Sequence, residues 1–317
     1  MPRTIPRPSL YLNTTMEQVI IDKEKCIGCG VCVTICPYRA IVLVDETAEY
    51  ILKDCFLCGQ CQAVCPENAV LLPQLTIKLG LVTMEEGEAA IPPGKTNAAE
   101  LVTLMRSRRS CRNYRNKPVA LAVLEDLVKI GTTAPSGTNS QSWNFIILPT
   151  MASLQVLGGM VSGYYRKLNR LAENPFLRFM VKIFGGDRLG RYFRRYHDSV
   201  AEALREWDEK GTDRLFHGAV AAILVTGKKD ASCPAEDALL ATQNILLAAH
   251  AMGLGSCLVG FVVEAMRRDP KLKKLVGIAD DEEIYSVIAL GYPAVNYLRP
   301  ANRKVVVPRV LRLTETR

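Results

Sequence analysis

The sequence of 317 residues predicts an α+β fold in two parts, in which a small cysteine-rich α+β domain precedes a larger sheet flanked by helices. Three observations lead to this prediction. A cysteine motif occurs twice within residues 1–80, a stretch without periodicity follows it, and helical and strand-like apolar segments then mix along the rest of the chain. Apolar residues make up 49% of the chain and charged residues 23%, which is typical of a globular protein with a substantial core.

The small domain is an internal repeat. CIGCGVCVTICP begins at Cys26 and CFLCGQCQAVCP begins at Cys55, and each is followed by a short apolar segment, AIVLV or AVLLP. QVIID and EYILK, which precede the two motifs, are expected to be the partner strands of these apolar segments. Each half should therefore contain a strand, a cysteine-rich loop, a short helical turn and a second strand.

The larger domain is expected to follow a linker at residues 81–96, where Gly, Pro-Pro and acidic residues occur without periodicity. Asn97 followed by Glu100 is typical of a helix start. The later segments are predicted to be a helix VALAVLEDLVKIG, a strand WNFIIL, a buried strand AVAAILVTG, a long helix from Pro234 to Met252 and a final strand IYSVIALGYP.

Composition and targeting signals favour a cytoplasmic protein. The formal charge of +8 is a modest excess, so we expect no nucleic-acid partner. MPRTIPRPSL lacks the apolar segment of a secretory signal. The apolar run from Ile245 to Val263 is nearly long enough to cross a bilayer, but it carries His250 and three glycines. We interpret it as a buried helix that leads into a loop and a strand.

The doubled cysteine spacing C-x2-C-x2-C-x3-C-P is typical of iron–sulfur clusters rather than of structural zinc or disulfides. In such a motif the first three cysteines surround one cluster, and the fourth binds the other cluster. Cluster 1 is therefore assigned to Cys26, Cys29, Cys32 and Cys65, and cluster 2 to Cys36, Cys55, Cys58 and Cys61. The small domain resembles a bacterial ferredoxin with two 4Fe–4S clusters, which implies transfer of single electrons.

Three stretches of the larger domain carry groups suited to a phosphorylated heterocycle. RSRRSCRNY contains Arg108, Arg109, Ser110 and Arg112, and Arg and Ser side chains bind phosphate well. TTAPSGTNSQSWNF presents small and amide residues directly before a strand, and GLGSCLVGF is glycine-rich. Each stretch alone is also compatible with a solvated surface or an ordinary loop.

In their order and spacing, these stretches, together with LGYPA and the NRK at Asn302, resemble the nitroreductase family of FMN-dependent oxidoreductases. The likeness covers roughly residues 97–307, apart from a variable segment at about 160–216. It implies a nitroreductase-like fold and a homodimer with FMN at the subunit interface. The domains are then predicted as 1–80, the linker 81–96, and 97–317 with the variable segment as a lid.

The resemblance also implies roles for individual residues. The FMN phosphate and ribityl chain should be held by Arg108, Arg109 and Ser110, with Arg303 or Lys304, and the pyrimidine edge should lie near Arg112. The partner subunit should contact the flavin through a loop that contains Pro135, Ser136, Gly137, Asn139 and Gln141. The backbone N–H groups of Val259 and Gly260 fall where the family contacts flavin N5 and O4. Ser142 replaces a usual proline of this loop, and Val259 a frequent acidic residue.

The variable segment is basic and aromatic. It is expected to be a lid for an anionic or aromatic acceptor, a docking face for an acidic donor protein, a membrane-surface helix at FLRFMVKIF, or an ordinary solvated helix. Tyr164 and Tyr165 are the candidate proton donors to a substrate.

We therefore expect an oxidoreductase that passes electrons from two 4Fe–4S clusters to FMN and then to a nitroaromatic, a quinone or a related acceptor. The donor would be a ferredoxin-like protein or NAD(P)H. The alternatives are a non-catalytic electron relay or redox sensor, and a quinone reductase at the membrane surface.

Overall fold

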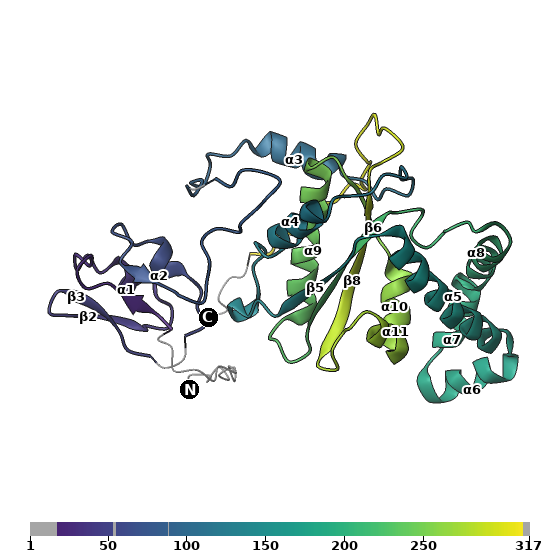
Figure 1. Ribbon diagram of the computed structural model, residues 1–317. Helices are drawn as coiled ribbons and strands as arrows, with labels where there is room; N and C mark the ends of the chain where they lie inside the picture. Colours follow the sequence, from purple (N-terminus) through teal and green to yellow (C-terminus); the bar gives the residue numbers. More distant parts are fainter. Residues whose placement is uncertain (1–17, 53–54, 88, 313–317) are drawn as a thin grey trace.

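The computed structural model describes residues 18–52, 55–87 and 89–312, and its cysteine-rich part consists of two small antiparallel sheets and two short helices (Figure 1). β1 (Ile20–Ile21) pairs with β4 (Val70–Leu71), and β2 (Ile41–Val44) pairs with β3 (Thr47–Tyr50). The strand before the first motif therefore pairs with the strand after the second. The repeat predicted from the sequence is confirmed as a structural repeat.

The two short helices of the repeat begin in the same way. Gly30 precedes α1 (Val31–Ile35) and Gly59 precedes α2 (Gln60–Ala63), and both glycines have a φ of 72°. This left-handed conformation is costly for residues with a Cβ but not for glycine. The glycine after the second cysteine of each motif therefore turns the loop into its helix.

The segment between β4 and α3 (Ala98–Ser107) forms no helix or strand where the structure describes it, as the sequence predicts for a linker. It is nevertheless fixed to the larger domain. The backbone N–H groups of Val82 and Thr83 donate to the buried carboxylate of Asp126, at 2.7–3.1 Å. α3 begins as predicted, because the Asn97 side chain accepts hydrogen bonds from the first turn.

The larger domain contains a four-stranded antiparallel sheet with the strand order β5-β6-β8-β7. Its strands are β5 (Trp143–Leu148), β6 (Ala221–Lys228), β7 (Gly255–Leu258) and β8 (Glu282–Gly291). The predicted strands WNFIIL, AVAAILVTG and IYSVIALGYP correspond to β5, β6 and β8. The fold is the predicted sheet flanked by helices.

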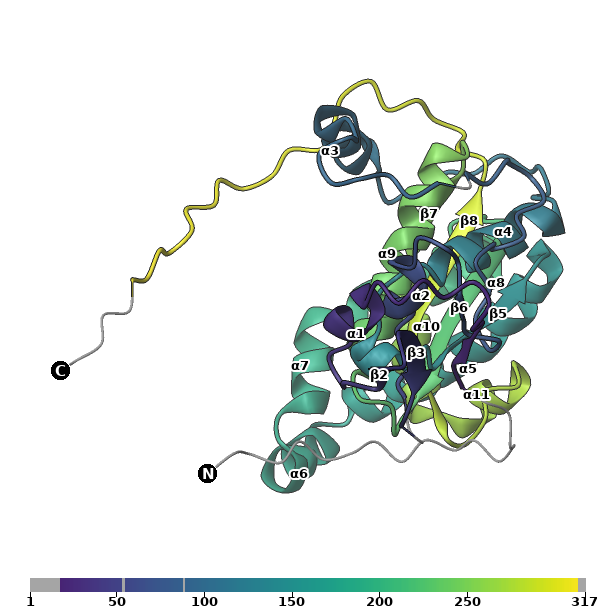
Figure 2. The same cartoon turned by 90° about the vertical axis from the view of Figure 1, so that its left-hand side faces the viewer.

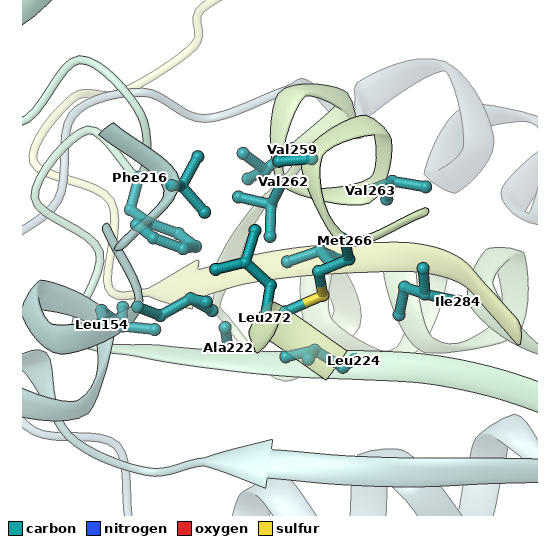
Figure 3. Packing of buried hydrophobic residues seen from close by; sticks show 14 of the residues in the cluster. Leu154, Phe216, Ala222, Leu224, Val259, Val262, Val263, Met266, Leu272 and Ile284 are labelled. Atoms are coloured by element: carbon teal, nitrogen blue, oxygen red, sulfur yellow. The ribbon is translucent and has the colours of Figure 1, made fainter. Parts of the chain in front are cut away.

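Both faces of this sheet are buried, which explains the apolar run in β6. Ile223 and Val225 pack on the face covered by α4 (Leu121–Gly131) and α9 (Pro234–Ala251). Ala222 and Leu224 point the other way, into a core shared with three further helices (Figure 3). These helices are α5 (Met151–Glu173), α10 (Gly260–Arg268) and α11 (Pro270–Leu275).

The predicted variable segment is helical and projects from the end of the molecule opposite the cysteine-rich part (Figure 1). After α5 it contains α6 (Pro175–Gly185), α7 (Arg188–Arg195) and α8 (His197–Lys210). Along α6 the side chains of Phe176, Phe179, Ile183 and Phe184 are exposed.

The long apolar run near the end of the chain is not one continuous helix. The run from Ile245 to Val263 is divided among α9, β7 and α10, and across the described residues no helix is long and apolar enough to cross a membrane.

Residues 294–312 form no helix or strand, and Figure 2 shows them passing α3 and then extending away from the body of the molecule.

Candidate functional site

The eight cysteines of the repeat surround two cavities. Cys36, Cys55, Cys58 and Cys61 line one cavity, and Cys26, Cys29, Cys32 and Cys65 line the other. Each cavity thus receives three cysteines from one motif and the fourth cysteine of the other motif. The structure brings together the residues that the spacing assigns to cluster 2 and cluster 1.

The surroundings of these sulfur atoms suit polynuclear clusters. Backbone N–H groups donate to the fourth cysteine of each motif, from Ala40 to Cys36 Sγ and from Ala69 to Cys65 Sγ, both at 3.2 Å. Burial raises the pKa of the Cys61 thiol to about 11, so its thiolate needs bound cations for stability. In the described chain no three His, Cys, Asp or Glu side chains are placed to hold a single metal ion. The four cysteines around each cavity and the backbone N–H donors to sulfur fit a pair of clusters.

A second group of candidate residues gathers at the C-terminal end of α9. Burial lowers the pKa of Arg108, and so do the positive charges of Arg303 and Arg109. These three residues, which we call the arginine cluster, make no ion pair with a carboxylate of the described residues. Unneutralised guanidinium groups that lie close together repel one another and favour a bound anion such as phosphate.

The chain segment after β8 returns to the arginine cluster, as the sequence analysis expects. The N–H of Ala294 donates to Asn113 O at 2.9 Å, and the Arg109 guanidinium lies 5.3 Å from the centre of the Tyr297 ring. Ser110 pairs with Ser256 of β7 through a β-bridge. Lys304 follows Arg303 directly in the chain and is exposed.

Two backbone N–H groups at the start of α10 are expected to contact a flavin, and the structure leaves one of them without a partner among the described residues. The N–H of Val259 donates to Val287 O at 2.9 Å and is used within the fold, so the expectation that it contacts a flavin is not met. Gly260 is the first residue of α10, where the N–H has no acceptor within the helix. A Cβ at Gly260 would meet no atom within 4 Å, so a flat ring has room to approach this backbone. Burial raises the pKa of the Cys257 thiol and the positive charge of Arg112 lowers it, so Arg112 lies near β7, which directly precedes α10.

The Pro135–Gln141 loop lies at the opposite end of α9. Asp237, in the first turn of α9, accepts hydrogen bonds from Gly137 N at 2.8 Å and from Ser140 Oγ at 3.1 Å. Asn139 and Gln141 have φ angles of 52° and 46°, in the left-handed region that non-glycine residues rarely adopt. A buried carboxylate therefore holds the backbone of this loop in a strained form.

The arginine cluster and the Pro135–Gln141 loop are far apart in one chain. α9 separates them and has 18 residues, which corresponds to about 27 Å at 1.5 Å per residue. The candidate residues thus form two half-sites, and the structure does not bring the halves together within a single chain.

The Pro135–Gln141 loop instead contacts the cysteine-rich part. Asn139 Nδ2 donates to Leu57 O at 2.7 Å and to Phe56 O at 3.4 Å. Leu57 lies between two cluster 2 cysteines and donates its own N–H to Cys55 Sγ at 3.3 Å. The loop that is expected to contact a flavin is therefore hydrogen-bonded to the loop that surrounds cluster 2.

The two tyrosines proposed as proton donors are engaged elsewhere. Tyr165 is buried, and its hydroxyl donates to Phe261 O at 2.8 Å, so the structure does not support it as a donor. Tyr164 stacks edge-on against Tyr165 and lies near charges of the last turn of α10, away from Gly260. Tyr196 and Phe261 instead form an edge-to-face pair at 5.8 Å beside Gly260, and both are partly exposed.

Sequence reasoning missed residues whose role depends on the fold. Asp237 lies in the first turn of α9, where an acidic side chain interacts favourably with the helix dipole whatever else it binds. Its position in the sequence therefore does not reveal that it anchors the Pro135–Gln141 loop. Burial lowers the pKa of His250, and the charge of Arg108 lowers it further, which places this histidine beside the arginine cluster. His217 is similarly affected by burial and by Arg112. No local pattern marks either histidine.

The comparisons with known proteins agree with this division of the chain. The sequence model of the nitroreductase family matches residues 105–292, and that of the 4Fe-4S dicluster domain matches residues 21–69. An NADH dehydrogenase of Thermus thermophilus is 27% identical over 208 residues, covering 65% of this chain and 91% of that protein. A nitrobenzene nitroreductase of Ectopseudomonas oleovorans is 25% identical over 197 residues, covering 60% of this chain and 85% of the relative.

Among solved structures, a nitroreductase with bound FMN from Bacteroides fragilis covers 69% of this chain with 22% identity. The match covers 100% of that structure, with a TM-score of 0.49.

Proposed function

Because the chain belongs to the nitroreductase family and carries a 4Fe–4S dicluster domain ahead of the family region, we propose that it is an iron–sulfur flavoprotein oxidoreductase. It passes electrons from two 4Fe–4S clusters through FMN to a small organic acceptor. The observation that carries this proposal is the hydrogen bond from Asn139 to Leu57, because it connects the loop around cluster 2 with a loop of the candidate flavin site.

The cofactors would be held by the residues described above. Cluster 1 and cluster 2 would be held by the cysteines that line the two cavities, and N–H groups directed at Cys36 and Cys65 would stabilise their thiolates. The arginine cluster would bind the FMN phosphate, Arg112 would place a positive charge near the isoalloxazine, and Gly260 would offer its N–H. When bound, the clusters supply single electrons, and FMN supplies a carrier that exchanges one or two electrons with an organic acceptor.

The protein is proposed to act as a homodimer. One flavin cannot reach the arginine cluster and the Pro135–Gln141 loop of the same chain, because α9 separates them by about 27 Å. A second copy related by a two-fold axis, with its α9 running antiparallel to the first, would bring one half-site of each kind together. The segment after β8 supports this assembly, since Val305, Val306 and Val307 are 81–93% exposed and need an apolar partner surface.

An aromatic or quinone acceptor fits the open side of the site. The space above Gly260 and the partly exposed rings of Phe261 and Tyr196 suit a flat apolar ring. The names of the relatives, among them a nitrobenzene nitroreductase, are consistent with such acceptors. Open space at this position favours an enzyme over a relay whose flavin is covered on both faces. Low-potential electron-carrier proteins are the proposed donors, with NAD(P)H as the second candidate.

The proposal can be tested by removing cluster 2. In a Cys58→Ala, Cys61→Ala variant that retains FMN, a reduced ferredoxin should no longer reduce the flavin, while dithionite still should. Flavin absorbance is followed anaerobically, with bound FMN and iron measured beforehand. Glu24→Gln, which changes an exposed residue of the cysteine-rich part that lines neither cavity, serves as the control. Unchanged ferredoxin-driven flavin reduction in the double variant would show that the clusters are not on the route.

A further inference from the structure

The two clusters are not equivalent in their surroundings. Cys29 of cluster 1 is exposed, and the neighbouring side chain of Ile27 is 64% exposed. The Phe56–Leu57 segment of cluster 2 faces the larger domain and accepts the hydrogen bonds of Asn139. Cluster 1 therefore lies on the side open to an external donor, and cluster 2 lies on the side that meets the flavoprotein domain.

A short path of bonds connects cluster 2 with the Pro135–Gln141 loop. Cys55 Sγ accepts a hydrogen bond from the N–H of Leu57 at 3.3 Å, and Leu57 O accepts one from Asn139 Nδ2 at 2.7 Å. Only the backbone of Leu57 lies between these two hydrogen bonds. The path thus runs from a cluster ligand to an amide of the candidate flavin site without a gap through solvent.

The far end of this path is held rigidly. Asp237 is buried and anchors both Gly137 and Ser140, and Thr138 packs its hydroxyl against Ser232 at 3.2 Å. From this anchored loop the Asn139 amide donates to Phe56 O and Leu57 O of the cluster 2 loop. The contact is therefore part of the folded loop rather than a chance meeting of two surfaces.

The position of this contact decides which flavin receives the electrons. The arginine cluster of the same chain lies at the other end of α9, about 27 Å away along the helix. In the proposed homodimer, the flavin that meets the Pro135–Gln141 loop of one subunit has its phosphate on the arginine cluster of the other subunit.

We propose that electrons enter at cluster 1, leave through cluster 2 and the Leu57–Asn139 contact, and cross to the flavin whose phosphate is bound by the partner subunit. This inference rests on the proposed function. Each transfer oxidises cluster 2 by one electron and reduces the flavin by one. Two transfers complete the reduction, with protons taken from water and electrons supplied by a low-potential carrier protein.

Two heterodimers test the crossing directly. In the first, one chain carries Cys58→Ala and Cys61→Ala, and the other carries Arg108→Glu and Arg303→Glu. In the second, one chain is wild type and the other carries all four substitutions. Two affinity tags isolate each heterodimer. Both contain the same substitutions and one intact flavin phosphate site, so general damage to the fold affects them equally.

Electron transfer between subunits predicts opposite results for the two heterodimers. After reduction by a ferredoxin, the flavin of the first should be reduced at the wild-type rate per site. The flavin of the second should stay oxidised, with the reduced-cluster signal persisting in EPR spectra. The reverse pattern, or equal rates in both, would overturn the proposal. Failure of wild-type clusters to reduce the flavin would instead contradict the proposed function itself.

A second measurement examines the contact without relying on electron transfer. Asn139→Asp tolerates the left-handed backbone but directs a carboxylate at two carbonyl oxygens, so it should loosen the cluster 2 loop. Hydrogen exchange in residues 55–61 should increase in the full-length holoprotein. Asn174→Asp, which keeps its cap on α6, is the matched control. If Asn139→Asp leaves hydrogen exchange in residues 55–61 unchanged, the Leu57–Asn139 contact does not hold the cluster 2 loop, and this part of the proposal is wrong.

Discussion

At the scale of single residues, the arginine cluster is the clearest anion site in the molecule. Arg108, Arg109 and Arg303 come together without a neutralising carboxylate among the described residues, and burial makes the charge of Arg108 costly unless an anion binds. Repulsion among these guanidinium groups destabilises the protein without a bound anion, and an anion that binds between them relieves the repulsion. We propose that this anion is the FMN phosphate, because the chain belongs to the nitroreductase family.

Replacing Arg108 with alanine should weaken FMN binding by about 10- to 100-fold. A hydrogen bond to a charged group contributes about 1.5–3 kcal/mol, and about 1.4 kcal/mol corresponds to a factor of ten. Flavin fluorescence during titration of the apoprotein measures this affinity. Arg205→Ala, on the exposed face of α8, is the control and should change nothing. Equal affinities for the Arg108 and Arg205 variants would argue against this phosphate site.

At the scale of elements, the linker is anchored by a single buried carboxylate. Asp126 accepts hydrogen bonds from Val82 N, Thr83 N and Thr83 Oγ1, and Lys129 lies 3.3 Å away. Burial alone would raise the pKa of Asp126, but these bonds lower it to about 2. The stabilisation is present above the ordinary value of 3.8 and is lost as the pH falls toward 2.

The Asp126→Asn variant should release the linker from α4. The amide has one oxygen instead of two and no charge, so buried donors lose partners, which costs about 1–3 kcal/mol. Faster hydrogen exchange at residues 80–84 and a lower melting temperature are expected. Glu125→Gln, at the exposed neighbouring position, is the matched control. A linker that stays protected in Asp126→Asn would show that other contacts hold it.

The packing of the helical segment α6–α8 should loosen as the pH rises. His197 bonds to Asp198 and Glu173, and these partners, the first most strongly, raise its pKa above the ordinary value of 6.5 against the opposing effect of burial. The charged pair therefore stabilises the α5–α8 packing below pH 6.5, and this contribution, about 0.2–1 kcal/mol, is lost as the pH rises through the folded pKa.

Hydrogen exchange of α6 and α7, corrected for the intrinsic effect of pH, checks this dependence. His197→Gln should make the packing of α6–α8 independent of pH over the same range, because the amide does not titrate. Wild-type protein in which the exchange of α6 and α7 does not change across this range would mean that the histidine contacts do not hold these helices.

The sequence predicted elements well where periodicity or local turn chemistry determines them. The doubled motif, the Asn97 cap and the apolar run of β6 all specify local structure, and the structure agrees with them. Contacts between distant segments were not predictable, because no local pattern links Asn139 to Leu57 or Val82 to Asp126. The N–H of Val259 was misjudged for the same reason, since only the pairing with β8 shows that it is occupied.

At the scale of the whole molecule, the segment after β8 is expected to hold two copies together. Valine side chains that are 81–93% exposed in one chain gain about 1.5–3 kcal/mol each when they are buried. A chain that ends at Lys304 should therefore dissociate at higher concentrations than the full chain and should bind FMN more weakly. Sedimentation at several concentrations measures the first effect, and FMN content measures the second.

Threonine substitutions separate apolar burial from loss of the segment itself. Replacing Val305, Val306 and Val307 by threonine keeps their shape and should weaken the dimer, while Val156→Thr on the exposed face of α5 should not. A truncated chain that remains dimeric at all concentrations would show that this segment does not build the interface.

The order in which the chromophores are reduced tests the central claim most directly. The holoprotein is mixed anaerobically with a reduced ferredoxin, and the cluster and flavin absorption bands are followed separately in time. We predict that the cluster bands bleach first, and that the flavin band follows at a rate that does not depend on donor concentration. Flavin bleaching that rises with donor concentration while the clusters stay oxidised would contradict the account.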